Sequence, residues 1–288
     1  MRTLVYSAIE RLRAAGIEDA RQITWWCVES AIGLDRLQIL SAGLEQIEAA
    51  DIDKFQKMID RCASGEPVQY VCGHTEFYGY RIEVSPAVLI PRPETEILVD
   101  AVLAFANGLA ELSVVDFGTG SGCIATALGH ELSHAKIIAV DVNRESLNVA
   151  AINVKGLPVR LVHGDLFDST TWTEIPTAIN VVVSNPPYIP IGEKQDMSST
   201  VVDFEPHEAL FVDSDPLVFY RALVEAASFL LAVGGALIVE IHSSYGAEVV
   251  DLFRSAGFGA VELSQDLAGL DRVVTARQTD DSIVGKKY

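Results

Sequence analysis

Basic residues are scarce in this chain of 288 residues, which holds 21 Lys and Arg against 40 Asp and Glu and has a formal net charge of −19. Nucleic-acid binding without sequence preference depends on Lys and Arg that neutralise phosphates, so the composition argues against a broad surface of that kind. The composition does not exclude a local patch of basic residues on the surface. Residues 1–62 are close to neutral, so most of the excess acid lies in the rest of the chain.

Cysteine is also scarce, and its spacing excludes two common uses. The four residues Cys27, Cys62, Cys72 and Cys123 form no C-x-x-C pair, and no His stands at a metal-ligand spacing from any of them. Neither a zinc site nor a disulfide framework is indicated. We therefore expect reduced, buried thiols and no metal centre.

Long apolar runs are missing as well. Residues 1–20 place Arg and Glu where a signal peptide would have its apolar segment. Further along, every apolar run is broken by a charge or by Gly-Gly before it reaches the length of a membrane span. These features predict a cytoplasmic protein that neither crosses nor binds a membrane.

Proline is absent from residues 1–62, where apolar positions recur at helical spacing. This pattern predicts a small helical domain over residues 1–64. Aromatic and β-branched residues then alternate around Gly73 and Gly79, which is typical of a hairpin. We predict that this hairpin and the proline-containing stretch after it form a connector and linker over residues 65–96.

Residues 97–279 alternate between continuous apolar strands and helical segments. Strands that are apolar on both faces and are separated by helices predict an α/β domain with a doubly wound, Rossmann-like and mostly parallel sheet. Near the end of this range, two further strands flank a turn-rich loop, which predicts an antiparallel hairpin at the edge of the sheet. Residues 280–288 are expected to form a loose tail.

The stretch "VVDFGTGSGCIATAL" joins one predicted strand to a helix through a glycine-rich turn. Such a turn brings backbone N–H groups and a helix N-terminus to the carboxyl end of a strand, where open sheets bind ligands. Cys123 stands where a dinucleotide fingerprint needs Gly or Ala. The spacing instead resembles the D-x-G-x-G-x-G turn of S-adenosylmethionine-dependent methyltransferases, and tight packing alone is the alternative. The cofactor-binding candidates are Asp116, Gly118, Thr119, Gly120, Ser121 and Gly122.

Acidic residues end the next two predicted strands. Asp141 is placed to accept hydrogen bonds from both hydroxyls of a ribose, although it could instead cap the following helix. Asp165 is placed to receive an adenine amino group, with Leu166 and Phe167 as an apolar wall, or else to cap its own loop. Asp116 could bind the cofactor ammonium or only brace the glycine turn.

The stretch "VVVSNPPYIP" ends the fourth strand in a stiff corner that is rich in acceptors. Prolines lack N–H groups and hold the preceding residue extended, so the carbonyl oxygens of this corner keep a fixed orientation without partners. Asn185 Oδ1 and the Pro186 carbonyl can each accept one hydrogen of an NH₂ group, while Tyr188 packs on the planar group. We predict methyl transfer to nitrogen, with Asn185 and Pro186 as catalytic residues. Asn185, Pro186, Pro187 and Tyr188 would bind the substrate, and Asn185 would also border the cofactor.

Several motifs occur in one order along almost the whole chain: "EPVQYVCGHTEFYGYRIEVSPAVLIPRPETEILVD", "VVDFGTGSGCIA", "VSNPPYIP", "DFEPHEALF" and "DLAGLDRVV". Together they resemble the protein-(glutamine-N5) methyltransferases that act on peptide-chain release factors. The resemblance implies a class I methyltransferase domain and S-adenosylmethionine as cofactor. It also implies that the glutamine of a Gly-Gly-Gln motif is the methyl acceptor, and that residues 1–64 take part in recognising the release factor.

The resemblance leaves the roles of some residues undecided. Arg92, Glu94 and Thr95 either cover the cofactor or fix the linker between the domains. The family pattern has Gly where this chain has His242 and Gln where it has Tyr245, so the resemblance assigns no role to these two residues.

Two other classes of protein are compatible with parts of the pattern. DNA adenine and RNA guanine amino-methyltransferases share the Asn-Pro-Pro-Tyr corner, but they would be expected to carry a segment rich in Lys and Arg near the active site, and none follows Ser64. A non-catalytic binding module would be favoured by a broken glycine turn or a broken corner. Both are intact in this sequence.

Overall fold

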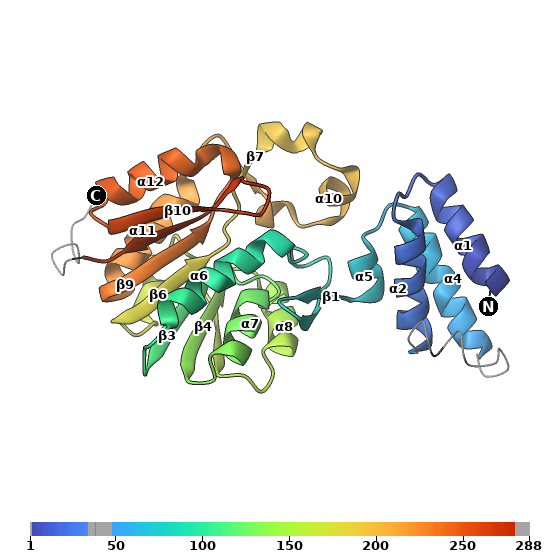
Figure 1. Cartoon of the computed structure of the whole chain (residues 1–288), viewed down its shortest axis with the longest axis horizontal. Coiled ribbons are helices and arrows are strands. Elements are labelled where there is room, and N and C mark those ends of the chain that lie inside the picture. The colour runs from blue at the N-terminus through green and yellow to red at the C-terminus, as the bar shows by residue number, and fades with distance from the viewer. Residues whose placement is uncertain (1, 34–37, 39–47, 280–288) are drawn as a thin grey trace. The chain divides into compact units, whose positions relative to one another are not determined.

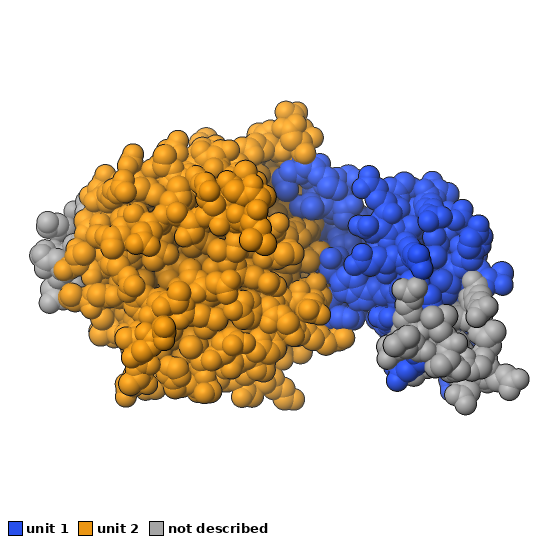
Figure 2. Space-filling view, in the orientation of Figure 1, with its two compact units in different colours: residues 1–74, 197–204 blue, residues 75–196, 205–288 orange. Residues whose placement is uncertain are grey.

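The computed structural model describes residues 2–33, 38 and 48–279. The chain divides into two compact units, which Figure 2 shows in blue and orange. Unit 1 comprises residues 1–74 and 197–204, and unit 2 comprises residues 75–196 and 205–288. The predicted tail at 280–288 lies outside the described residues, as do residues 34–37 and 39–47 of the predicted helical domain.

Unit 1 is helical. Along α4, the residues Phe55, Met58, Ile59 and Cys62 are buried at steps of three and four, so one apolar face of the helix packs inward. Gly33 ends α2 in a left-handed conformation, with φ of 74°, and its N–H donates to the Glu29 carbonyl. Within the described residues, the helices of unit 1 are α1 (Arg2–Ala14), α2 (Ala20–Ile32), α4 (Ala49–Ala63), α5 (Val68–Cys72) and α10 (Ser199–Phe204).

Helix α10 belongs to unit 1 although it comes much later in the chain than the other helices. The Phe204 ring lies 3.7 Å from the point where a Cβ would stand on Gly65. The sequence pattern assigns residues 197–204 to the predicted domain 97–279, whereas in the structure these residues are part of unit 1. A segment this short can be assigned to a unit only through its long-range contacts, which hydrophobic periodicity does not reveal.

The predicted hairpin is present but shorter than the alternation suggests. Strands β1 (His74–Phe77) and β2 (Tyr80–Glu83) pair with each other. Both turn residues, Tyr78 and Gly79, have positive φ, as a two-residue type I′ turn requires. Residues 68–72, which the alternation assigned to the same hairpin, form helix α5 instead. The apolar side chains of that segment are buried, so tertiary packing overrides the β propensity of its valines.

Unit 2 contains a seven-stranded sheet with the order β10-β11-β9-β6-β3-β4-β5. All neighbouring strands from β9 to β5 run parallel, whereas β11 is antiparallel to both β9 and β10. The prediction of a mostly parallel sheet with an antiparallel edge hairpin is confirmed. The strands are β3 (Leu112–Phe117), β4 (Ala135–Asp141), β5 (Val159–His163), β6 (Ile179–Ser184), β9 (Leu231–Glu240), β10 (Gly259–Gln265) and β11 (Asp271–Arg277).

Helices cover both faces of the sheet (Figure 1). Helices α6, α7 and α8 contact one another in succession, and α9 and α12 each contact α11. Because the central strands are covered on both sides, they are almost continuously apolar and buried. The helices are α6 (Glu96–Ala106), α7 (Cys123–Glu131), α8 (Arg144–Asn153), α9 (Ser169–Thr173), α11 (Val218–Leu230) and α12 (Gly246–Ser255).

Short elements connect the larger ones in unit 2. The two-residue strands β7 and β8 pair in parallel and tie the chain after the Asn-Pro-Pro-Tyr corner to a later loop. The short elements are η2 (Pro93–Thr95), β7 (Ile189–Pro190), η3 (Ile191–Asp196), η4 (His207–Ala209), β8 (Phe211–Val212) and η5 (Ser243–Tyr245).

Three of the four cysteines are buried, and Cys72 is partly buried. All four thiols are free, and Cys27 Sγ lies 3.8 Å from Cys62 Sγ in the core of unit 1. Within the described ranges, no group of three or more His, Cys, Asp or Glu side chains is suited to a metal ion. None of the helices described is both long enough and apolar enough to cross a bilayer.

Candidate active site

A cavity of about 350 Å³ lies in unit 2, at the carboxyl ends of the parallel strands. Much of its wall is built by residues at or just after the carboxyl ends of β3, β4, β5 and β6, which meet at this edge because the strands share one direction. Arg92 and Thr95, from the segment before α6, also line it. Its volume falls in the range of small-molecule sites, roughly 300–1,000 Å³. Ten predicted site residues line it: Gly118, Thr119, Gly120, Ser121, Asp141, Asp165, Leu166, Asn185, Pro186 and Pro187.

The glycines of the turn after β3 have different surroundings. Gly118 and Gly120 have positive φ and line the cavity, and no atom lies within 4 Å of the point where a Cβ would stand on either. A ligand can therefore approach their backbone closely. Gly122 does not line the cavity, because it faces α8, where a Cβ would come within 3.1 Å of Ala150. This third glycine lets helix and turn pack closely.

Asp141 is mostly buried and accepts two backbone hydrogen bonds. Its Oδ2 accepts from the Gly120 N–H and its Oδ1 from the Asn143 N–H, each at 2.8 Å. Burial raises the pKa of this carboxyl, while the two backbone bonds lower it. The cap of α8 is the Asn143 side chain, not Asp141. Each carboxylate oxygen can accept a second bond, so Asp141 can hold a ribose while it braces the glycine turn.

Asp141→Ala is expected to weaken binding of S-adenosylhomocysteine by roughly tenfold to a hundredfold, because hydrogen bonds to a charged acceptor contribute about 1.5–3 kcal/mol. Titration calorimetry measures this loss. Since the substitution also loosens the glycine turn, the same titration is repeated with the 2′-deoxy analogue. The parent should discriminate against this analogue and the variant should not. Equal discrimination by both proteins would contradict ribose binding by Asp141.

Asp165 lies in the loop after β5 and bends its own backbone. Its Oδ1 accepts from the Phe167 N–H at 2.9 Å, which is an Asx turn. Asp165 therefore caps its own loop and also lines the cavity. Phe167 also lines the cavity, is half-exposed and meets Phe219 edge to face, with 5.1 Å between ring centroids. These rings give the cavity an apolar wall that suits a planar base.

Asp116 is fully buried and does not line the cavity. Its Oδ2 accepts from the Thr119 hydroxyl at 2.6 Å, so this residue braces the turn. Its Oδ1 has no hydrogen-bond partner among the described residues. Burial raises the pKa of the Asp116 carboxyl to about 7, and the charge of Asp141 adds to the rise, whereas the Thr119 bond opposes it.

The Asn185-Pro186-Pro187 corner forms one side of the cavity. Asn185 Nδ2 donates to Thr95 Oγ1 at 3.1 Å, which turns Asn185 Oδ1 away from Thr95. Within the described part of the chain, neither Asn185 Oδ1 nor the Pro186 carbonyl has a hydrogen-bond donor. These two oxygens come from neighbouring residues, and both can accept hydrogen bonds from an NH₂ group.

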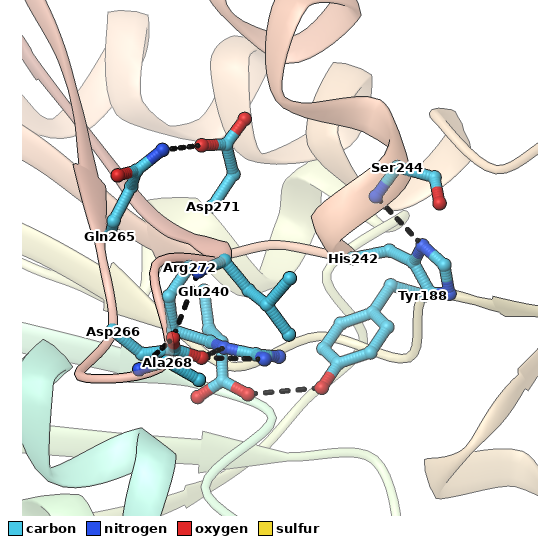
Figure 3. A network of polar contacts seen from close by, with 10 residues as sticks. Tyr188, Glu240, His242, Ser244, Gln265, Asp266, Ala268, Asp271 and Arg272 are labelled. Carbon is cyan, nitrogen blue, oxygen red and sulfur yellow. Dashed lines mark hydrogen bonds and ion pairs between the residues drawn. The ribbon is translucent and has the colours of Figure 1, made fainter.

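Tyr188 is not part of the cavity wall. Its hydroxyl donates to Glu240 Oε1 at 3.0 Å, and its ring lies edge to face with His242 (Figure 3). Burial and the charge of Glu240 raise the pKa of the Tyr188 hydroxyl. The packing of this ring on a planar substrate group stays a prediction.

Buried groups from distant parts of the chain support the site, and the sequence alone does not identify their partners. Glu205 accepts from the Ile90 N–H and forms an ion pair with Arg92, with 2.6 Å between Arg92 Nη2 and Glu205 Oε1. Thr95 and Glu240 are also buried, and Thr95 lines the cavity. Arg92, Thr95 and Glu205 lie in the motifs that carry the resemblance, so an acidic or hydroxyl residue in such a motif was the available signal, whereas Glu240 lies in the stretch "ALIVEI" outside them.

The residues of the cavity fit S-adenosylmethionine, which carries a positive charge. Open space lies beside the backbone of Gly118 and Gly120, carboxylates lie in the wall at Asp141 and Asp165, and Asp116 has an orphaned carboxylate oxygen next to the turn. Buried carboxylates without counter-charges are stabilised by a cationic ligand. S-adenosylmethionine, with its positively charged sulfur, is a ligand of this kind.

Two family models match the chain. The PrmC N-terminal domain matches residues 3–73, and the methyltransferase small domain matches residues 94–203. Among solved structures, the hMettl16 catalytic domain in complex with MAT2A 3′UTR hairpin 6 superposes with a TM-score of 0.55 at 17% identity. The match covers 80% of this chain and 83% of that one. It shows the class I methyltransferase fold.

Relatives in several bacteria are similar along nearly their whole length. The release factor glutamine methyltransferase of Geobacter sulfurreducens is 37% identical, with 92% of each chain covered. That of Moorella thermoacetica is 36% identical, with 98% of this chain and 99% of the relative covered. That of Neisseria gonorrhoeae is 41% identical, with 84% and 88% covered. The chain belongs to the release factor glutamine methyltransferase family, whose members use S-adenosylmethionine.

Proposed function

We propose that this protein transfers a methyl group from S-adenosylmethionine to the side-chain amide nitrogen of the glutamine in the Gly-Gly-Gln motif of peptide-chain release factors. The names of its relatives support this substrate. The observation that carries the proposal is the pair of acceptors in the cavity wall, Asn185 Oδ1 and the Pro186 carbonyl, neither of which has a donor within the described residues.

The reaction needs an amide that is held and polarised, because the nitrogen lone pair of an amide is delocalised and weakly nucleophilic. Asn185 Oδ1 and the Pro186 carbonyl would each accept one amide hydrogen, which fixes the plane of the group. When bound, S-adenosylmethionine would supply an electrophilic methyl group on a positively charged sulfur. As the nitrogen attacks, the sulfur–methyl bond breaks, S-adenosylhomocysteine leaves, and the methylated nitrogen releases one of its two protons to water. The two acceptors interact more strongly as the nitrogen gains positive charge, so they stabilise the transition state more than the ground state.

The same cavity wall would hold the cofactor. We assign the backbone from Gly118 to Gly122 and the carboxylates of Asp141 and Asp165 to this role, with Leu166 as part of the apolar wall and Asp116 bracing the turn. We assign Asn185 to both roles, because it lines the cavity and its Oδ1 has no donor among the described residues.

Labelled S-adenosylmethionine tests the function directly. We expect transfer to a purified release factor, no transfer to a release factor whose Gly-Gly-Gln glutamine is replaced by alanine, and no transfer to duplex DNA or structured RNA. Labelling of DNA adenine or RNA guanine without labelling of the factor would favour an amino-methyltransferase of nucleic acid, which uses the same corner.

Unit 1 is proposed to contribute to recognition of the release factor, because a protein substrate needs contact area beyond one side chain. The family model that matches residues 3–73, most of unit 1, is separate from the model that matches the methyltransferase domain. The unit is not a continuous piece of chain, since α10 is part of it. A truncation therefore has to remove both segments.

Deleting residues 1–73, up to the first residue of β1, and replacing Met197–Phe204 with a Gly-Ser linker is expected to lower kcat/KM for an intact release factor about tenfold or more, as the loss of one or more interface anchors does. Affinity for S-adenosylhomocysteine should stay within about twofold, and this titration shows that the shortened protein is folded. A folded protein that methylates the factor at the parent rate would contradict the recognition role.

A further inference from the structure

The wall of the cavity is acidic with one exception. Among the described residues, Asp141, Asp165 and Glu208 line the cavity, and Arg92 is the only basic residue that does so. The cofactor carries positive charges on its sulfur and its ammonium group, which suit these carboxylates. It also carries one carboxylate, which such a wall would repel unless a cation stood within reach. Arg92 is the side chain in the wall that can offset this repulsion.

The backbone fixes the position of Arg92. Pro91 precedes it and Pro93 follows it. Its backbone is extended, with φ of −98° and ψ of 142°, which is the conformation that a following proline favours. The Arg92 carbonyl accepts from the Thr95 N–H at 3.1 Å, which ties the residue to η2. A stiff stretch of chain therefore presents this side chain to the cavity.

A deeply buried carboxylate holds the guanidinium of Arg92. Arg92 Nη2 donates to Glu205 Oε1 at 2.6 Å, and the Ile90 N–H donates to Glu205 Oε2 at 3.1 Å. The Glu205 side chain is 1% exposed, whereas that of Arg92 is 33% exposed. A carboxylate buried to this extent is costly unless it is paired and hydrogen-bonded. Glu205 therefore anchors Arg92 from the interior of unit 2.

This anchor uses only a small part of the guanidinium. An arginine side chain has five N–H donors, and Glu205 Oε1 is the one atom to which Arg92 donates in the part of the chain that the structure describes. The other Glu205 oxygen accepts from the Ile90 N–H, so the two residues do not form the two-bond pair that arginine and a carboxylate often make. The remaining donors of Arg92 can therefore bind a second carboxylate.

The connectivity of the cofactor indicates which of its groups would meet Arg92. We assigned the ribose to Asp141 and the methyl acceptor to Asn185, and the sulfur of the cofactor links its ribose to its amino-acid group. The amino-acid group therefore continues past the sulfur, away from the ribose. Arg92 lies toward the Asn185 side of the cavity, because Thr95, three residues after it, accepts from Asn185 Nδ2 at 3.1 Å.

We propose that Arg92 binds the α-carboxylate of the amino-acid group of S-adenosylmethionine, and that Glu205 is the buried anchor that holds its guanidinium in the cavity wall. Without this cation, the wall would attract the sulfur and the ammonium group of the cofactor and repel its carboxylate. The inference rests on the cofactor and on its assigned position in the cavity, and it does not depend on the proposed methyl acceptor.

Two ligands isolate the contribution of the carboxylate. S-adenosylhomocysteine carries it, and the decarboxylated analogue S-adenosyl-3-thiopropylamine keeps the adenine, ribose, sulfur and amine. Titration calorimetry gives both affinities for each protein. Arg92→Met combined with Glu205→Gln removes one charge of each sign, and the new amide can still accept from the Ile90 N–H. Affinity for S-adenosylhomocysteine should fall about tenfold to a hundredfold, while affinity for the analogue should stay within about threefold.

Two further proteins serve as a second test and a control. Arg92→Lys keeps a positive charge for Glu205 but loses the planar set of donors, so it should bind S-adenosylhomocysteine at least about threefold more weakly, with no such loss for the analogue. Asp266→Asn combined with Arg272→Met is the matched control. This pair is also mostly buried, with 3.0 Å between Arg272 Nη2 and Asp266 Oδ2, and lies outside the cavity wall (Figure 3). Both affinities should stay within about twofold of the parent.

The ratio of the two affinities decides the inference. If the Arg92 variants lose affinity for both ligands equally, or keep the ratio of the parent, Arg92 only shapes the wall and the inference is wrong. If the double variant binds neither ligand, the ratio in Arg92→Lys decides alone. A parent protein that binds S-adenosylhomocysteine but methylates no release factor would overturn the proposed function, and the titrations would still decide the role of Arg92.

Discussion

Asn185→Ala is expected to lower turnover on a release factor on the order of a hundredfold or more, the usual effect of removing one preorganised electrostatic contact. The substitution removes one of the two acceptors in the cavity wall and leaves the prolines in place. Because the lost bond strengthens as the amide nitrogen gains charge, the loss should appear in kcat more than in KM. Steady-state kinetics with labelled cofactor measures both.

Asn180→Ala is the matched control. It removes an asparagine at the start of β6, the same strand that Asn185 follows, where Asn180 Oδ1 accepts from the Ser113 N–H and hydroxyl away from the cavity. This variant should lose some stability and keep nearly the parent turnover. A folded Asn185→Ala protein with turnover within a few-fold of the parent would overturn the mechanism.

The free energy of unfolding is expected to fall as pH rises from about 4 to about 7 through the titration of Asp116. The pKa of this carboxyl rises from 3.8 to about 7 on folding, mainly through burial. The protonated form is therefore favoured in the folded protein. Its stabilising contribution is fully present below the unfolded pKa and is lost as pH rises through the folded pKa, a loss of about 4 kcal/mol at most.

Urea unfolding of the parent and of Asp116→Asn, at a series of pH values across this range, isolates the contribution. Repulsion within the acidic chain changes with pH in both proteins, so the difference between them reports Asp116. The parent should lose stability relative to the variant as pH rises. A pH-independent difference would show that Asp116 does not titrate in this window.

Proton release on ligand binding tests the protonation of Asp116 in a second way, through the ammonium group of the cofactor. If it lies near Asp116 Oδ1, binding of S-adenosylhomocysteine at pH 6–7 should release a proton, which calorimetry in buffers of different ionisation enthalpy detects. The Asp116→Asn variant should show no such release. If parent and variant release equal numbers of protons, Asp116 only braces the turn.

The sheet could be predicted from sequence because each central strand is an apolar run bounded by turn residues. Strand β6 (Ile179–Ser184), for example, is buried along almost its whole length, as a strand covered on both faces must be. The segment at 68–72 shows the opposite case. Its alternation indicates a strand, but burial of its side chains in unit 1 makes it a helix.

The residues that face the cavity could be predicted because they are local to strand ends. Gly118 and Asn185 stand directly after a parallel strand and Asp141 ends one, and the topology brings these ends together. Their supports could not be predicted, since the partner of Asn185 stands 90 residues earlier in the chain and that of Tyr188 stands 52 residues later. Local periodicity carries no information about such pairs.

Helix α10 has a consequence for how the chain folds during synthesis. The helices at the start of the chain leave the ribosome first, but the last helix of the same unit is made only once residue 204 has been added. Unit 1 therefore cannot reach its final packing until much of the sheet of unit 2 has already emerged. The folding of the first part of this protein is thereby coupled to the progress of translation itself.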